Sequence, residues 1–170
     1  VTGSGTPSDP FMIYDCKALQ NIKNNLTASY ALQNDIDCSA TRNWNYGAGF
    51  EPIGKEITRD IYGNYYMGSA FLGVFNGQGY IVAGLYINRP SEDFIGLFGG
   101  ITSNITRLGV VSSQIIGKSE VGVIAGHVVG VVLNRVYSNG DLISVNTGQR
   151  IGGLVGSVKN SVINNTYSSV

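Results

Sequence analysis

Three similar segments follow one another in the second half of the chain, and their spacing limits the folds that it can adopt. Each segment begins with a short apolar phrase that contains glycine, at residues 95–99, 121–126 and 151–156. The glycines that end these phrases, Gly99, Gly126 and Gly156, lie 27 and 30 positions apart. After a polar break, a second phrase follows at residues 105–110, 133–138 and 163–168. A two-phrase unit that recurs at such a period is typical of a solenoid.

The phrases are too short to be helices. An amphipathic helix needs apolar residues at three-to-four-residue spacing over about ten or more positions, whereas these phrases are short, rich in β-branched residues and interrupted by glycine. Each phrase is therefore predicted to be a strand. Stacking successive coils places Leu97, Ile124 and Leu154 in one interior column, and the neighbouring glycines permit tight bends, where positive φ is often required and a Cβ would clash. The predicted fold is all-β: a parallel β-helix.

The phrases also carry a family resemblance. Residues 96–99 (Gly-Leu-Phe-Gly) and 153–156 (Gly-Leu-Val-Gly) resemble the Gly-Leu-x-Gly signature of GLUG-motif repeats, and residues 71–81, 50–54 and 30–37 resemble the segments that precede those repeats. The middle repeat departs from the signature with Val-Ile-Ala-Gly at residues 123–126. The match covers most of residues 11–170 and implies a β-helix found in large secreted and surface proteins of bacteria and archaea. It implies little about activity, because such repeats are scaffolds around varied functions.

Composition excludes several classes of partner. Lys plus Arg and Asp plus Glu number 11 each, so the formal net charge is zero and no electrostatic footprint for nucleic acid or an anionic membrane is present. Charged residues make up 13% of the chain, about half of the roughly 25% usual in soluble domains. No apolar run approaches the length of a membrane span. A surface of low charge, rich in Ser, Asn, Thr and Tyr, favours an extracellular or cell-surface location.

The chain divides into four predicted parts. Residues 1–10 are expected to be a flexible arm or linker, or alternatively a segment that becomes ordered on a neighbouring subunit. Residues 11–40 are expected to be an N-terminal cap, with an N-cap at Asp15 and a short helix over residues 16–26 that covers the end of the solenoid. Residues 41–70 are predicted to be an aromatic-rich loop or hairpin insertion, and residues 71–170 the β-solenoid repeats.

Cys16 and Cys38 are the two cysteines of the chain, and both flank the predicted cap. An even pair this close in sequence favours a disulfide in an oxidising compartment, with two buried thiols as the alternative. A tetrahedral metal site is not expected, because no Cys-x-x-Cys is present and His127 is the single histidine.

The insertion supplies the candidate ligand-binding residues. Trp44, Tyr62, Tyr65 and Tyr66 lie in a stretch dense in aromatic and charged residues, and exposed rings there could stack on a sugar or anchor a protein partner. The alternative interpretation is that these rings cover one flank of the core.

Catalytic chemistry is not predicted, and neither is a cofactor. His127 follows a repeat glycine with no nucleophile motif nearby, and is expected at a turn or coil surface. Glu92 and Asp93 are adjacent, so their side chains are expected to point to opposite sides of a solvated turn. Asp35 and Asp37 would share one face of a strand, which leaves weak calcium binding as an alternative. The chain is therefore predicted not to be an enzyme.

Three sequons are present, at Asn25, Asn104 and Asn164. If the host glycosylates, Asn104 in a turn is the best candidate and Asn25, near the cap, is the second.

The sequence ends at Val170 within a second phrase, where no Pro, helix or charged strand covers the last coil. We expect either further coils or the N-terminal region of a neighbouring subunit to cover this end. A head-to-tail contact that does not close would build a filament. The predicted function is thus a non-enzymatic extracellular structural or adhesive β-solenoid, with a surface-filament subunit as its sharper form. Its partners would be itself or other surface proteins. The alternative is a carbohydrate-binding module that holds glycans on the aromatic loop.

Overall fold

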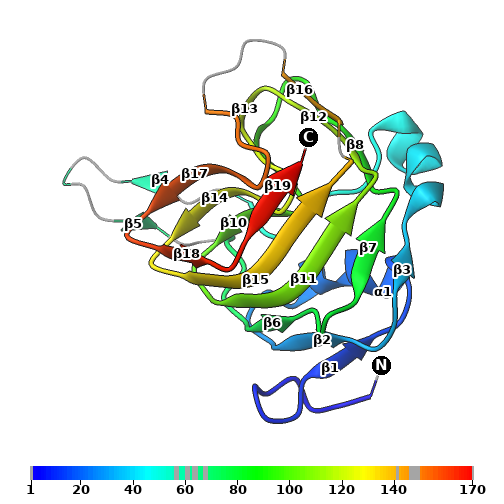
Figure 1. Cartoon of the computed structure of the whole chain (residues 1–170), viewed down its shortest axis with the longest axis vertical. Coiled ribbons are helices and arrows are strands. Elements are labelled where there is room, and N and C mark those ends of the chain that lie inside the picture. Colours follow the sequence, from blue (N-terminus) through cyan, green and yellow to red (C-terminus); the bar gives the residue numbers. More distant parts are fainter. Residues whose placement is uncertain are drawn as a thin grey trace.

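The computed structural model describes residues 2–55, 58–59, 62, 65–66, 69–140, 142–145 and 150–169, without the side chains of residues 58–59, 65–66, 142 and 144–145. Its strands form a parallel β-solenoid in which successive coils stack along one axis (Figure 1). The predicted fold class is therefore confirmed, including a short helix near the N-terminus.

The coils contribute short strands to the faces of the solenoid. The N-terminal region contains β1 (Phe11–Ile13), α1 (Cys16–Asn21), η1 (Ile22–Asn24), β2 (Tyr30–Leu32), β3 (Ile36–Asp37), η2 (Ser39–Asn43), η3 (Asn45–Gly47), β4 (Thr58–Arg59) and β5 (Tyr65–Tyr66). Three regular coils follow. They are β6 (Phe75–Asn76), β7 (Ile81–Ala83), β8 (Tyr86–Asn88), β9 (Asp93–Ile95) and β10 (Phe98–Ile101); then β11 (Ile105–Val111), β12 (Gln114–Gly117), β13 (Ser119–Val121) and β14 (Ala125–Val129); then β15 (Val132–Asn139), β16 (Leu142–Val145) and β17 (Val155–Lys159). The last strands are β18 (Val162–Asn164) and β19 (Tyr167–Ser169).

The largest sheet runs through the whole stack in the order β1-β2-β6-β11-β15-β18. Three more strands belong to it: β3 pairs with β7, β7 with β11, and β19 with β15. Figure 1 shows this sheet face-on, with β1 at one end and β19 at the other. The other faces are the sheets β10-β14-β17, β8-β12-β16 and β9-β13. Strand pairing in these sheets is parallel, and the hairpin β4–β5 is antiparallel. Equivalent residues of successive coils therefore form columns along the stack.

The predicted interior column is confirmed. Leu97 and Ile124 are fully buried, and Leu154 packs against the core from the last regular coil. Backbone N–H groups link the column, since Ile124 donates to the carbonyl of Leu154 at 2.9 Å. A short strand buries little by itself, but each column repeats the same burial at every coil.

A row of rings crosses the core at the N-terminal half of the stack. Phe11, Tyr30, Phe71 and Phe98 follow one another with ring centroids 5.8, 6.2 and 5.2 Å apart, and Phe75 meets Phe98 edge-on at 5.3 Å. Rings at such distances add to the free energy of burial through their quadrupoles. The row ties the first coils to the regular ones.

Glycine with positive φ supplies some bends between faces, as expected, such as Gly84 between β7 and β8 and Gly140 between β15 and β16, but not all of them. One bend carries Phe94, Glu120 and Arg150 in successive coils, with φ of 60°, 52° and 68°. The glycines that end the repeated phrases serve close backbone approach instead. A Cβ at Gly126 would lie 2.5 Å from the carbonyl carbon of Phe94, and one at Gly99 would lie 2.4 Å from the carbonyl oxygen of Gly54. These glycines are therefore required for packing of backbone on backbone.

The N-terminal arm differs from the flexible segment that the sequence suggested. The N–H of Met12 donates to the carbonyl of Thr2 at 2.9 Å, and the N–H of Ser29 donates to the carbonyl of Gly5 at 2.8 Å. The arm thus follows the outer edge of β1 and pairs within its own chain, because an open strand edge needs partners for its N–H groups.

The helix begins as predicted, with the side chain of Asp15 accepting the N–H of Ala18 at 2.7 Å. It ends at Asn21, five positions before the predicted end at residue 26, and a 3-10 turn over Ile22–Asn24 follows.

Residues 41–70 are not a single insertion, and the coils begin before residue 71. Phe50 and Ile53 are fully buried, and Ile53 forms a parallel bridge with Phe98. The strands β2 and β3 already pair with β6 and β7. The aromatic and polar composition of this stretch gave no sign of these two core residues. Elsewhere in the stretch, the described residues include the end of η2, the 3-10 helix η3 and the strands β4 and β5.

Candidate functional site

The predicted disulfide is present. Cys16 at the start of α1 and Cys38 after β3 are bonded, with Cα atoms 5.3 Å apart, and both are buried. The alternative of two buried thiols is therefore wrong. The bond links the helix of the first coil to the end of β3 in the second, and it fits an oxidising compartment.

The candidate aromatic residues are not shown to form one platform. Trp44 is partly buried and packs against the core, which is the alternative that the sequence left open for these rings. Tyr62 is 84% exposed. Tyr65 and Tyr66 form β5, but their side chains lie outside the described atoms. The binding role of these four residues stays a prediction.

All three sequon asparagines are exposed. Asn25 lies at the C-cap of η1, and its Oδ1 accepts the hydroxyl of Thr27, the third residue of the sequon, at 3.0 Å. Asn104 lies before β11, and its Oδ1 accepts the N–H of Val132 in the next coil at 2.9 Å. Asn164 is in β18. Glycosylation of these residues stays a prediction.

Asp35 and Asp37 bind backbone groups. Asp35 Oδ1 accepts the N–H of Ile81 at 3.0 Å, and Asp37 Oδ1 accepts the N–H of Ser39 at 2.8 Å. The hydrogen bonds from Ser39 hold the pKa of Asp37 below its usual range. Asp37 thus stabilises the turn after β3, and Asp35 joins this coil to the one that contains β7. Across the described part of the chain, no group of three or more acidic, Cys or His side chains could hold a metal ion.

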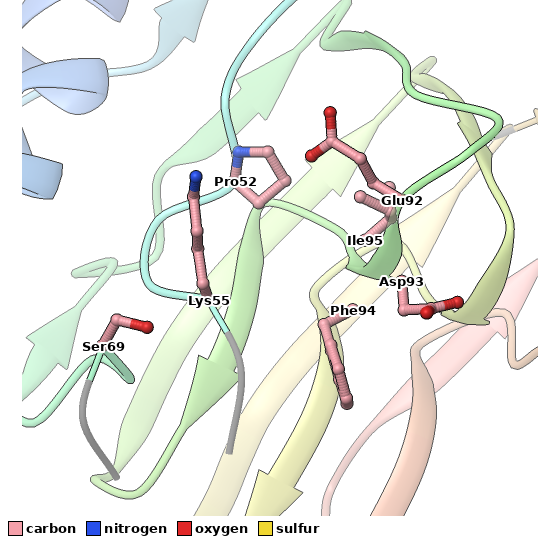
Figure 2. A pocket seen from close by; sticks show the side chains of 7 residues that line it. All are labelled: Pro52, Lys55, Ser69, Glu92, Asp93, Phe94 and Ile95. Carbon is pink, nitrogen blue, oxygen red and sulfur yellow. The ribbon is translucent and has the colours of Figure 1, made fainter. Parts of the chain in front are cut away.

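A pocket of about 310 Å³ opens beside β9 (Figure 2). Its lining residues are Pro52, Lys55, Ser69, Glu92, Asp93, Phe94 and Ile95. Figure 2 shows the carboxylates of Glu92 and Asp93 pointing away from each other, as expected for neighbours.

Each charged group of this pocket has an ionic partner outside the lining. Lys55 lies 3.6 Å from Glu51, Glu92 lies 2.9 Å from Arg89, and Asp93 lies 3.3 Å from Lys118. Two carboxylates that act on one substrate must converge on it, and these two diverge. The arrangement is that of a solvated, ion-paired surface.

A polar cluster around the buried carboxylate of Glu120 lies at the same bend in the following coils, and the sequence analysis missed it. Glu120, with a side chain only 8% exposed, sits at the start of the middle repeat and contacts His127 Nδ1 at 3.1 Å and Arg150 of the following coil. His127 is therefore held inside a cluster rather than at a coil surface as predicted. Its Nε2 is buried and has no hydrogen-bond partner among the described residues. The one available signal was a carboxylate placed directly before an apolar phrase that ends in Gly-His.

Two opposing effects set the pKa of Glu120. Burial raises the pKa, but the hydrogen bonds and charges of His127 and Arg150 outweigh burial and hold the pKa below its usual value. Because the folded pKa is depressed, the carboxylate stabilises the fold above its unfolded pKa of about 4.3. That stabilisation is lost as the pH falls through the folded value.

We expect Glu120→Gln to lower the free energy of unfolding by about 1–3 kcal/mol near pH 7, because it weakens two charge-assisted contacts at a buried position. The difference from the wild type should shrink as the pH is lowered toward about 3. Denaturant unfolding over this pH range measures both effects. Glu92→Gln, at a half-exposed pair, is the matched control and should change stability by about 0.5 kcal/mol or less. A Glu120→Gln loss that stays constant down to the lowest pH would contradict the pKa assignment.

The edge of the last coil carries exposed apolar side chains. Ile151, Val158 and Ile163 are 50%, 46% and 38% exposed. One coil earlier, their column partners Val121, Val128 and Leu133 are fully buried. These three columns are therefore uncovered at the edge of the last described coil.

Sequence comparison relates the chain to much longer proteins. No protein-family model matches it, so the GLUG resemblance stays a prediction. The chain is similar to halomucin. Halomucin of Haloquadratum walsbyi is 36% identical over 163 residues, which cover 92% of this chain and 2% of halomucin. A protein of Evansella cellulosilytica named "Putative Gly-rich membrane protein" is 33% identical over 139 residues, which cover 78% of this chain and 15% of that protein. The chain thus spans a small part of each relative.

The fold has a counterpart among solved structures. The crystal structure of a "putative immunoglobulin A1 protease" from Bacteroides ovatus matches with a TM-score of 0.58, over 98% of this chain and 68% of that one. The two sequences are 15% identical, so the likeness shows the fold alone. Among the described residues, no helix is both long enough and apolar enough to cross a membrane.

Proposed function

We propose that this chain is part of a non-enzymatic, extracellular structural or adhesive β-solenoid, in which a further coil, of the same protein or of another copy, covers the edge at β17 and β18. An extracellular location is supported by the disulfide between Cys16 and Cys38, and by relatives whose names refer to a mucin and a membrane protein. A structural role is supported by the paired, diverging charges of the pocket beside β9, which offer no convergent acid and base.

The assembly proposal rests on one observation: residues that occupy the same column are buried in one coil and exposed in the last. Leu133 is fully buried, whereas Ile163, its partner in β18, is 38% exposed. A further coil stacked on β17 and β18 would bury Ile151, Val158 and Ile163 as their partners are buried. Burial of apolar surface stabilises by about 25 cal/mol per Å², so this edge favours association.

The opposite end of the stack does not offer the same surface. There the N–H of Met12 in β1 already donates to Thr2, and α1 turns exposed polar residues such as Lys17 and Asn21 outward. Where two copies of this chain meet with the edge at β17 and β18 open, we therefore expect contact between two last coils, which gives a two-fold dimer, in preference to the head-to-tail filament that the sequence suggested.

Light scattering over a concentration series, with negative-stain microscopy, tests the assembly. We expect the mass to rise toward twice that of the chain, with particles of about double length. Val158→Asp with Ile163→Asp should keep the chain monomeric, because charges would be buried in the contact. Leu72→Asp, at a side chain of similar exposure (42%) near the other end, is the matched control and should leave the dimer intact.

If microscopy shows uniform fibres, the chains associate head to tail and the dimer proposal is wrong. A wild type that stays monomeric across the series would contradict self-assembly altogether.

A further inference from the structure

A groove of about 250 Å³ lies on the outer face of the largest sheet, far along the chain from the aromatic loop. Its lining residues are Gly79, Arg107, Arg135, Tyr137 and Asn165. These residues come from the β6–β7 turn, from the neighbouring strands β11 and β15, and from the turn between β18 and β19, so the groove crosses several coils (Figure 1). We call it the basic groove.

The backbone at this place requires a bend but not an arginine. Gln78, Arg107, Arg135 and Asn165 adopt φ of 55°, 54°, 55° and 50° in successive coils. Asparagine and glycine enter this left-handed region at least cost, and Asn165 meets the requirement in the last coil. The bend therefore does not by itself account for arginine in two consecutive coils.

The two guanidinium groups have no carboxylate within ion-pair distance among the described residues. Arg107 donates from Nη2 to the carbonyl of Gln78 at 3.3 Å. Thr106 pairs with Asn134 and Leu108 with Val136, which places Arg107 directly opposite Arg135 at the strand spacing of about 4.8 Å. Like charges opposite each other on paired strands are destabilising. An anion between them would remove this repulsion.

Several other cationic side chains of this protein, unlike Arg107 and Arg135, do have a carboxylate partner. Arg89, Lys118 and Lys23 each lie within 3.3 Å of a carboxylate. The pKa of Tyr137 is raised chiefly by burial, then by Tyr167 and then by the carboxylate of Asp35. Asp35 is thus near enough to the basic groove to influence it. Asp35 accepts the N–H of Ile81, and no ion pair joins it to either arginine. The groove therefore keeps a net positive charge in a chain whose total charge is zero.

Tyr137 gives the groove a fixed amphipathic wall. Its ring occupies the space over Gly109, where a Cβ would lie 2.4 Å from the ring carbon Cζ. The ring also stacks on Tyr167, with centroids 5.0 Å apart and planes 11° apart. A tyrosine held in this way loses little entropy on binding and offers both an apolar surface and a hydroxyl.

We propose that the basic groove binds acidic sugar units of a glycan, with Arg107 and Arg135 holding a carboxylate or sulfate. The planar fork of arginine matches either group in a bidentate manner. The amide of Asn165 and the hydroxyl of Tyr137 would bind sugar hydroxyls, and the volume suits one or two pyranose rings. Single-stranded nucleic acid fits less well, because Tyr137, the ring in the lining, is stacked on Tyr167 on one face and lies over Gly109. This site is independent of the proposed assembly edge.

Isothermal titration of the whole chain with polygalacturonate and with dextran sulfate tests the proposal, with neutral dextran as the blank. Arg107→Asn with Arg135→Asn should weaken binding about tenfold or more, since each guanidinium contributes charge-assisted hydrogen bonds. Asparagine already occupies this bend at residue 165, so the variant keeps the fold, and its thermal unfolding verifies this. Arg42→Asn is the matched control. It removes one positive charge, as each of the two groove substitutions does, at an arginine that lies 4.4 Å over the ring of Tyr86, and should bind as the wild type does.

The possible results of the titration either support the basic groove as an acidic-glycan site or contradict it. Binding of polygalacturonate or of dextran sulfate, lost in the double variant alone, supports the site and identifies the anionic group. Equal binding of neutral dextran, equal loss in Arg42→Asn, or tighter binding of a single-stranded oligonucleotide would overturn the assignment. Because Arg107 and Arg135 lie apart from Ile151, Val158 and Ile163, failure here leaves the assembly proposal untouched.

Discussion

Replacing Phe98 with alanine should lower the free energy of unfolding by about 4 kcal/mol, the largest loss that we expect from a single substitution in this chain. Phe98 is fully buried, and its ring lies 5.2 Å from Phe71 and 5.3 Å from Phe75. Its backbone also joins coils, because it bridges Ile53 before it and pairs with Ala125 after it. Truncation would leave a cavity where three coils meet, and stacked coils cannot close on it without breaking their registers.

Chemical denaturation and thermal unfolding measure this loss, which corresponds to a fall of roughly 8–16 °C in Tm for a chain of this size. Tyr46→Ala is the matched control, since it removes a fully exposed ring and should change stability by about 0.5 kcal/mol or less. Phe98→Leu should recover much of the loss, because it refills most of the volume. Equal stability of Phe98→Ala and the wild type would mean that the row of rings does not hold the coils together.

Removing the disulfide with Cys16→Ala and Cys38→Ala should cost about 3 kcal/mol, the second large effect. The bond spans a sequence separation of 22 residues and restricts the unfolded chain, which raises the free energy of the unfolded state. Alanine fills the two buried positions without adding a polar group, so the loss reports mainly on the cross-link. A fall of roughly 6–12 °C in Tm is the corresponding thermal effect.

Reduction of the wild type supplies an independent check. The wild type with dithiothreitol should unfold at a similar temperature to the double variant, and the double variant should not respond to the reagent. If reduction leaves the Tm unchanged, the cap is held by packing of Leu19 and Ile22 alone, both of which are buried.

Several features of the fold could be predicted because they depend on local or periodic signals. The repeated phrases indicated parallel stacking, and Leu97, Ile124 and Leu154 were assigned to one column, because translation by one coil preserves the face of every residue. The cysteine spacing indicated the disulfide. Asp15 was recognised as an N-cap from its position before the apolar residues of α1.

Other features could not be predicted, because they depend on contacts between distant segments. Phe50 and Ile53 lie in a stretch whose composition is that of a loop, and only the bridge from Ile53 to Phe98 makes them core residues. Residues 2–10 contain Gly, Ser and Pro and read as a linker, yet the open edge of β1 supplies hydrogen-bond partners for them. His127 was predicted to lie at a coil surface from the residues next to it in the sequence. Its contact with Glu120 forms across a bend and gives no local signal.

The repeat by itself determined the class of fold, the direction of stacking and the interior columns, since a period near one coil length admits few other ways to bury short strands. Tertiary structure decided which polar residues meet. The cluster of Glu120 with His127 and Arg150, and the basic groove of Arg107 and Arg135, depend on bends at which left-handed residues turn side chains toward neighbours one coil away. The period indicates that coils repeat, but the register at each bend decides which charges lie opposite each other.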